Sequence, residues 1–300
     1  MPNGILIIDK PQDWTSQDVC AKLRGVFHEK RIGHAGTLDP MATGVLPVFV
    51  GRATRAVEFA SEGEKEYLAG LRLGTVTDTQ DVTGTVLETR PVSVGRADLE
   101  AVLEHFRGDI QQVPPMYSAI KIRGKKLYEL ARKGKEVERP PRPITIFSLT
   151  VEEQTGETDF LLRVRCSKGT YVRTLCHDIG QKLGCGGTMF SLRRTMAAGF
   201  SLDQARTLEE VLDCPEPEDL LMPVDAYFAG YPALALPPHL EKRVRNGVAV
   251  PVDGTADGTF RVYGAEGAFL ALSRVQQGRL STIKSFFEAP APNTKEREQL

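Results

Sequence analysis

The sequence predicts an α+β fold: a mixed, mainly antiparallel sheet with flanking helices, followed by a small β-rich domain. Apolar and polar residues alternate over residues 65–73, as they do in a half-buried strand. Residues 144–152 and 159–166 alternate in the same way across a short connection, which predicts an antiparallel pair. Beyond residue 247 the chain holds short apolar runs and glycine turns without a long helical pattern, so we expect a separate β-rich unit there.

The other elements follow from apolar spacing and from proline and glycine. Residues 5–9 predict a buried strand that ends at Lys10, and Ser16 is the expected N-cap of the next helix. Residues 30–47 are rich in glycine and proline and should form an ordered loop. Apolar spacing predicts further helices at 51–59, 96–106 and 172–183, and a capping box predicts one at Thr207.

Glycine and proline residues cluster near residues 228–238 and predict a domain boundary. We therefore expect one domain at 1–228, a second at 235–288 and a disordered tail at 289–300. Proline pairs bracket a basic excursion at about 110–143 within the first domain, which should contain one short helix.

The composition limits the classes of protein to which the chain can belong. Hydrophobic residues make up 41% and charged residues 26%, which is ordinary for a soluble globular chain. No apolar run approaches the length of a membrane span and the N-terminus lacks a secretory pattern, so we expect a cytoplasmic protein without membrane contact. The five cysteines include no Cys-x-x-Cys pair, which argues against a zinc site or a disulfide framework. Cys176-His177 is a weak ligand pair, and we expect no metal.

The formal net charge is −1, yet charge is unevenly distributed. Residues 117–143 carry nine Lys or Arg side chains and three acidic ones, a local excess of six positive charges. Such a segment can bind a polyanion, and it can equally be the solvated face of a charged helix. Charge alone leaves the two interpretations open.

The segment from Gly33 to Pro47 combines glycines and prolines with ionisable side chains more densely than other segments. It reads Gly-His-Ala-Gly-Thr-Leu-Asp-Pro-Met-Ala-Thr-Gly-Val-Leu-Pro. Pro40 stiffens the chain after Asp39 and biases Asp39 toward an extended conformation. An ionisable side chain is thereby mounted on a fixed loop, as binding and catalytic groups commonly are. An Asp-Pro turn that caps a helix is the alternative.

This segment resembles the catalytic motif of the bacterial TruB family, whose members make pseudouridine at position 55 of the tRNA T-loop. Ala35 departs from the Thr common in related sequences and leaves His34 and Asp39 intact. Further segments resemble the family in the same order over roughly residues 4–228. They are Gly4–Pro11, Lys65–Tyr67, Gly74–Asp81, Pro114–Lys121, Cys166–Arg173 and Ser191–Arg194.

The resemblance implies roles for individual residues. Asp39 matches the nucleophilic aspartate, and Arg173 matches the arginine that pairs with it. Tyr67 matches the tyrosine that stacks on the target base and is also proposed as a proton acceptor. His34 matches the histidine that enters the T-loop. Tyr171 and Leu192 match residues that line the uridine pocket. Taken one by one, Tyr67 and Leu192 are better explained as core residues, Arg173 as a surface ion pair and His34 as a loop residue. Only their joint order along the family pattern favours the functional roles.

These residue types suit the chemistry that the resemblance implies. Isomerisation of uridine breaks the N1–C1′ bond and joins C5 to C1′ without redox change, so no cofactor is expected. A carboxylate must be ionised to form a covalent intermediate, and a guanidinium beside it favours that form. The base must also leave its stack before Asp39 can reach it. The sequence leaves open whether Asp39 attacks C6 or C1′, or first removes a 2′ proton.

The resemblance also suggests partners. The basic excursion falls where TruB-like proteins carry a thumb that closes over the tRNA T-arm stem-loop, with Lys121, Lys125, Lys126, Arg132 and Lys133 as phosphate contacts. The C-terminal unit resembles an RNA-binding PUA domain by position and β-rich pattern. We expect a monomer that needs no protein partner and no guide RNA.

The sequence leaves three alternative functions. A tRNA-binding or tRNA-folding protein would keep the fold without needing turnover, although the intact Asp39, Tyr67 and Arg173 favour catalysis. A guide-dependent synthase would be expected to carry long basic extensions, which this chain lacks. A small-molecule hydrolase with an aspartate nucleophile would leave the basic excursion unexplained.

Overall fold

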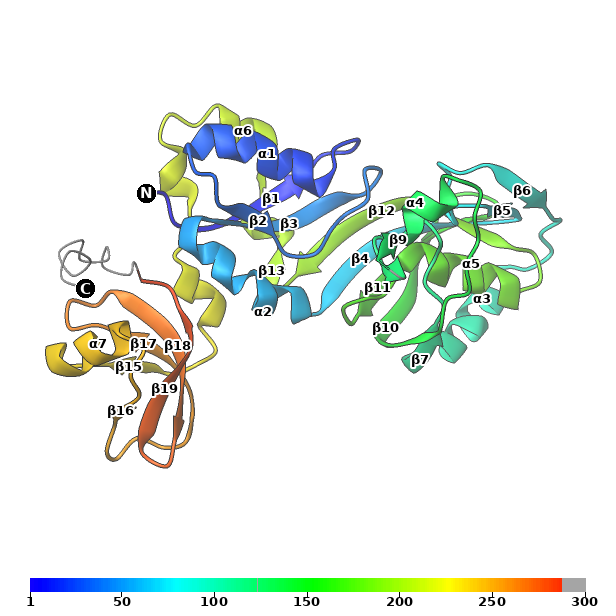
Figure 1. The fold of residues 1–300 in the computed structure, drawn as a ribbon. Helices are drawn as coiled ribbons and strands as arrows, with labels where there is room; N and C mark the ends of the chain where they lie inside the picture. The colour runs from blue at the N-terminus through cyan, green and yellow to red at the C-terminus, as the bar shows by residue number, and fades with distance from the viewer. Residues whose placement is uncertain (123, 288–300) are drawn as a thin grey trace.

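The computed structural model describes residues 1–122 and 124–287. Within them one large sheet has the strand order β14-β1-β3-β12-β4-β11-β10-β7, with β2 paired to β3 and β13 to β12. Figure 1 shows this sheet running across the molecule, with the C-terminal sheet to one side of it. The strands are β1 Gly4–Lys10, β2 Ile32–His34, β3 Thr43–Val50, β4 Lys65–Leu73, β7 Gly108–Gln112, β10 Arg142–Gln154, β11 Asp159–Cys166, β12 Gly187–Ala197, β13 Phe200–Ser201 and β14 Arg206–Thr207.

The large sheet is mixed, and antiparallel pairs dominate it, which confirms the predicted fold class. The expected pair β10 and β11 is antiparallel, and β11 in turn pairs antiparallel with β4. Strand β12 lies between β3 and β4, parallel to the first and antiparallel to the second. This central strand joins the N-terminal part of the sheet to the part formed by β4, β11 and β10.

Helices cover the sheet through their apolar sides. Helix α5 packs Leu175, Cys176 and Ile179 against a core built on β4, β10, β11 and β12. Helix α1 packs Val19 and Leu23 against β1 and β3. The helical elements of this part are α1 Ser16–Phe27, η1 Gly51–Ala56, α2 Val57–Glu62, α3 Arg96–Leu103, η2 Glu104–Phe106, α5 Val172–Lys182, η3 Leu202–Gln204, α6 Leu208–Leu212, η4 Pro217–Leu220 and η5 Val224–Phe228.

Two local predictions were wrong. The N-cap of α1 is Thr15, which forms a capping box with Asp18, because the Ser16 hydroxyl is turned toward the chain near Leu38 instead. Residues 30–47 are not wholly loop, since β2 pairs antiparallel with β3 there and forms a short ladder. The predicted capping box at Thr207 is present and starts α6.

The basic excursion between β7 and β10 has structure of its own. Strands β8 (Lys121–Ile122) and β9 (Lys125–Lys126) form a hairpin, and α4 (Leu127–Ala131) follows where a short helix is expected. Its buried Leu127 anchors the excursion. A second hairpin, of β5 (Thr75–Thr77) and β6 (Val86–Thr89), follows β4.

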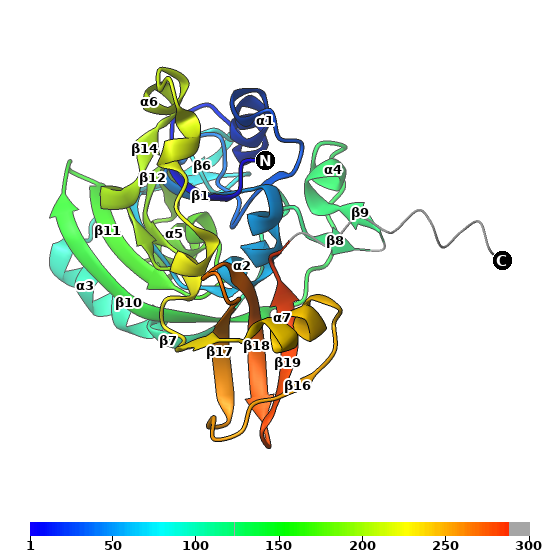
Figure 2. The ribbon, with the colours of Figure 1, turned by 90° about the vertical axis from the view of Figure 1, so that its left-hand side faces the viewer.

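The C-terminal part forms a five-stranded sheet of order β15-β17-β18-β19-β16, seen below the large sheet in Figure 2. It is joined to the first part by the Tyr263 hydroxyl, which donates to Asp225 (2.7 Å), and by an ion pair of Lys284 with Glu58 (2.7 Å). The predicted tail at 289–300 lies outside the described residues. The elements are β15 Ala233–Ala235, α7 Pro238–Arg245, β16 Val250–Pro251, β17 Gly258–Tyr263, β18 Phe269–Gln276 and β19 Arg279–Ser285.

Candidate active site

Asp39 lies on the loop between β2 and β3, and this loop is fastened to the start of α1. The Leu38 amide donates to the Ser16 hydroxyl (2.9 Å), which donates back to the Leu38 carbonyl (3.3 Å). The Asp13 amide donates to the Pro40 carbonyl at 2.8 Å. Because Leu38 is buried while the Asp39 side chain is 40% exposed, the loop holds its carboxylate toward solvent on a fixed backbone.

Arg173 in the first turn of α5 faces this carboxylate. Its Nη2 atom lies 3.3 Å from Asp39 Oδ2 and donates to the Tyr117 carbonyl at 2.7 Å. The Arg173 side chain is only 9% exposed. The predicted pairing of Asp39 with Arg173 is therefore present, and the arginine also ties the base of the excursion to the site.

Asp81 is a second carboxylate on Arg173, and the sequence did not single it out as a site residue. Its Oδ2 atom lies 3.3 Å from Arg173 Nη1, and its side chain is 4% exposed. Its Oδ1 atom accepts hydrogen bonds from Thr79 (2.8 Å) and from the amide (3.0 Å) and hydroxyl (2.5 Å) of Thr83. These hydrogen bonds fix the orientation of the Asp81 carboxylate, so it can hold the guanidinium in place.

Tyr67 and Leu192 lie on one face of the sheet. In the pairing of β4 with β12, Tyr67 is opposite Arg194 and Ala69 is opposite Leu192, so these four side chains share a face. Tyr67 and Leu192 are both buried. Burial raises the pKa of the Tyr67 phenol, whereas the charge of Arg194 opposes that rise. The phenol is therefore protonated at neutral pH in the unliganded protein.

Tyr171 is the N-cap residue of α5 and is held through its backbone. Its amide donates to the Gln112 side chain (2.8 Å), whose nitrogen donates to the Tyr171 carbonyl (3.1 Å). Burial raises the pKa of its phenol, and the neighbouring Ser118 side chain opposes that rise. Tyr171 thereby connects β7, α5 and the excursion two residues before Arg173.

His34 ends β2 and is half-buried. Its Nε2 atom forms a hydrogen bond with Gln17 Nε2 at 3.1 Å. Burial, and then the charge of Arg194, lower the pKa of His34, so the imidazole is neutral at pH 7. The structure places it at the start of the loop that carries Asp39.

Lys10 is fully buried beneath that loop, although the sequence suggested only the end of a strand there. Its ammonium donates to the carbonyls of Trp14 (2.6 Å), Pro11 (2.8 Å) and Pro40 (3.3 Å). Burial lowers the pKa of Lys10 from 10.5 to about 8. Lys10 thus helps to hold Pro40, the residue next to Asp39, in place.

The predicted phosphate contacts fall into two sets. Lys121, Lys125 and Lys133 are exposed. Lys126 donates to the Tyr128 hydroxyl (3.1 Å) and lies over its ring, and Arg132 also lies over that ring. The structure therefore gathers Lys126 and Arg132 around Tyr128, whose amide donates to the carbonyl of Ser118, the residue after Tyr117.

The cysteine and metal-ligating side chains form no further reactive site among the described residues. Burial raises the pKa of the Cys176 thiol to about 12, so it is protonated and fits packing rather than ligation. Within residues 1–122 and 124–287, no three His, Cys, Asp or Glu side chains are grouped so as to hold a metal ion. In the same residues no helix is long and apolar enough to cross a membrane.

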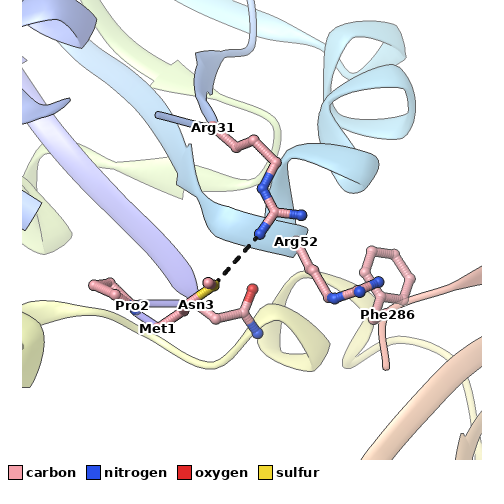
Figure 3. Close-up of a pocket in the computed structure, with 6 residues that line it drawn as sticks. All are labelled: Met1, Pro2, Asn3, Arg31, Arg52 and Phe286. Carbon is pink, nitrogen blue, oxygen red and sulfur yellow. Dashed lines mark hydrogen bonds between the residues drawn. The ribbon is translucent and has the colours of Figure 1, made fainter. Parts of the chain in front are cut away.

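The structure has two cavities whose linings do not include Asp39. One of about 280 Å³ is lined by the N-terminus, Arg31, Arg52 and Phe286, and Figure 3 shows both arginines and Phe286 around it. The other, of about 480 Å³, is lined by Trp14, Leu208 and Leu212 with the Asp9–Arg193 ion pair. Neither is lined by Asp39, Arg173 or Tyr67, although Lys10, which donates to the Pro40 carbonyl, lines the second.

Comparison with known proteins identifies the family. Residues 24–172 match the model of the TruB family pseudouridylate synthase N-terminal domain, and residues 173–229 match that of the tRNA pseudouridylate synthase B C-terminal domain. The chain belongs to the TruB family of pseudouridine synthases. The first match contains Asp39 and Tyr67, and the second begins at Arg173, so both sides of the ion pair lie in matched segments.

Two relatives show how far the likeness extends. The chain is 41% identical to tRNA pseudouridine synthase B of Clostridium kluyveri, over 95% of this chain and 99% of that protein. It is 40% identical to tRNA pseudouridine synthase B of Escherichia coli K12, over 96% of each. The resemblance to the TruB family is therefore confirmed over nearly the whole chain.

Solved structures support the fold. A Cbf5–Nop10–Gar1 complex contains a chain with a TM-score of 0.73 and 25% identity, over 95% of this chain and 85% of that one. An archaeal box H/ACA Nop10–Cbf5 complex contains one with a TM-score of 0.70 and 23% identity, over 96% and 87%. The arrangement of sheet and helices is thus shared with that group.

Proposed function

We propose that this chain converts uridine 55 in the T-loop of tRNA to pseudouridine, with Asp39 as the nucleophile. The observation that carries the proposal is the pairing of a half-exposed carboxylate with the buried Arg173 guanidinium. The guanidinium orients the carboxylate for attack, and the fixed loop keeps it in one position. Membership of the family and the names of its relatives supply the reaction class and the RNA.

The reaction needs rearrangement without oxidation. The N1–C1′ bond breaks, the uracil turns, C5 bonds to C1′, the C5 hydrogen leaves as a proton and N1 takes one up. No redox cofactor or metal enters this balance. In the proposal Tyr67 supports the flipped base, Tyr171 and Leu192 line its pocket, and His34 enters the space left in the T-loop.

The excursion at about 110–143 acts in this proposal as a thumb over the T-arm, with Lys121, Lys125, Lys126, Arg132 and Lys133 on phosphates. The domain at 1–228 is the catalytic one, and the unit at 235–288 is a PUA-like RNA-binding domain. The protein works in the cytoplasm as a monomer without a guide RNA. The Cbf5 chains, by contrast, are described in complexes with other proteins.

The test uses an unmodified T-arm stem-loop with the wild type, Asp39→Asn and a surface control, Asp253→Asn. Pseudouridine should form at position 55 with the wild type and the control, and the Asp39→Asn rate should fall by at least ~10³-fold with binding retained. Product at the wild-type rate from Asp39→Asn would overturn the nucleophile assignment. Binding without product from the wild type would favour the tRNA-folding alternative.

A further inference from the structure

Arg194 is a fully buried arginine at the centre of the sheet. It lies on β12, opposite Gly44 of β3 on one side and opposite Tyr67 of β4 on the other. Figure 1 shows β12 between these two strands. A Cβ atom at Gly44 would lie 2.2 Å from the Arg194 carbonyl oxygen, so the backbones approach closely there and glycine is required.

The guanidinium of Arg194 contacts the loop that bears Asp39 at both of its ends. Its Nε atom donates to the Val45 carbonyl at 2.6 Å, and its Nη2 atom donates to the Gly36 carbonyl at 3.0 Å. Gly36 has a φ of +80°, and a Cβ there would lie 3.2 Å from Arg194 Nη1. One buried side chain therefore bridges residues 36 and 45 through hydrogen bonds to both carbonyls.

The charge of Arg194 faces no carboxylate. Among the described residues none lies within ion-pair distance of its guanidinium, and Nη1 makes no hydrogen bond to them. Burial lowers the pKa of Arg194, and the Tyr67 phenol, which lies opposite Arg194 in the pairing of β4 with β12, opposes this shift. A neutral side chain could also donate to two carbonyls, so the loop contacts alone do not explain a buried positive charge. The side chain opposite that charge on β4 is Tyr67.

We propose that Arg194 is a positioning residue that joins the Asp39 loop to Tyr67 and places a positive charge beside the Tyr67 hydroxyl. The guanidinium fixes the separation of nucleophile and aromatic ring, and its charge favours negative charge on the Tyr67 oxygen. The catalytic part of this inference rests on the proposed function. The link between Arg194 and the loop does not.

The test compares Arg194→Met, Arg194→Lys, Tyr67→Phe and the Arg194→Met/Tyr67→Phe double variant. Arg193→Met is the matched control, because Arg193 is the next residue of β12 and pairs with Asp9 instead. Hydrogen exchange of residues 36–45 reports the loop without requiring activity. Single-turnover rates at saturating T-arm RNA, with separate dissociation constants, report catalysis apart from binding.

Arg194→Met should speed exchange in the loop and lower the single-turnover rate by about 10²-fold, while affinity for RNA changes by less than about threefold. In the Tyr67→Phe background the same change should cost much less, because the two residues act together. Unchanged exchange in Arg194→Met would overturn the link to the loop. Rate losses that simply multiply in the double variant would overturn the link to Tyr67.

Arg194→Lys keeps the proposal testable where the methionine variant does not fold. A lysine retains the charge but presents one ammonium, which cannot replace the guanidinium on two separate carbonyls. Exchange in the loop should therefore rise, with a rate loss smaller than that of Tyr67→Phe. Wild-type values in both measurements would overturn the inference. A wild type that makes no pseudouridine would overturn the proposed function, while the exchange data would still decide the loop.

Discussion

The Nη2 atom of Arg173, at the start of α5, lies 3.3 Å from Oδ2 of Asp39 on the β2–β3 loop. The two partners differ in exposure, since the arginine side chain is 9% exposed and the aspartate side chain 40%. The cation is thus held by protein while the anion remains open to a substrate. The same Nη2 atom donates to the Tyr117 carbonyl, and Nη1 contacts Asp81, so protein groups hold both terminal nitrogens of the guanidinium.

Arg173→Lys is predicted to lower the single-turnover rate of pseudouridine formation by about 10²-fold while T-arm binding changes little. A lysine ammonium cannot contact Asp39, Asp81 and the Tyr117 carbonyl in the fixed geometry of the guanidinium. Lys182→Arg, on the last turn of the same helix, is the control. A rate within about threefold of wild type would show that the charge alone suffices.

Removing the charge of Arg173 should also destabilise the fold. Arg173→Met leaves Asp81 buried without its cation, and we expect a loss of about 3 kcal/mol in the free energy of unfolding, measured in urea. Adding Asp81→Asn removes the unpaired charge and should restore much of that loss without restoring activity. Equal stability of the single and double variants would contradict a pairing of these two residues.

Much of the fold could be predicted because local patterns decide it. The alternation in residues 65–73 and 159–166 matches the bounds of β4 and β11, since each strand has one face on the core. The N-cap of α1 could not be assigned in this way. Thr15 and Ser16 are both good capping residues, but the Ser16 hydroxyl accepts a hydrogen bond from Leu38, which is distant in the sequence.

The candidate site was predicted through the family resemblance, and what escaped prediction is polar and buried. Asp39 and Arg173 stand in motifs, and their contact agrees with the predicted pair. Asp81, Lys10 and Arg194 also lie in segments that resemble the family, but as single charged residues they suggest exposed positions. Arg194 is buried by the pairing of β12 with β3 and β4, Lys10 by its contacts with Trp14 and Pro40, and Asp81 by its contacts with Arg173 and Met189. No local pattern reveals these long-range contacts.

The exposed thumb lysines should contribute to RNA binding through counterion release. Lys121→Ala, Lys125→Ala and Lys133→Ala are each predicted to weaken T-arm binding and to reduce the slope of log affinity against log salt by about one. Lys182→Ala is the matched control. The slopes come from dissociation constants measured across a salt series. A slope that none of the three variants changes would mean that the basic excursion is a solvated surface.

Asp178 on α5 provides a test of electrostatics that does not depend on RNA. Burial raises the pKa of this carboxyl from 3.8 to about 6. Between these two values the unfolded chain loses its proton while the folded protein keeps it, so folding becomes less favourable as pH rises, and the loss is complete above about pH 6. Asp178→Asn carries no such charge.

Asp178→Asn should therefore be more stable than the wild type at pH 8, by up to about 3 kcal/mol, and should lose this advantage near pH 4. Urea unfolding at several pH values measures the difference. The neighbouring His177, whose pKa burial lowers, acts in the opposite direction, since its unfolded form takes up a proton below about pH 6.5. His177→Gln in both backgrounds separates the two effects. An Asp178→Asn advantage that does not vary with pH would show that the carboxyl is not the titrating group.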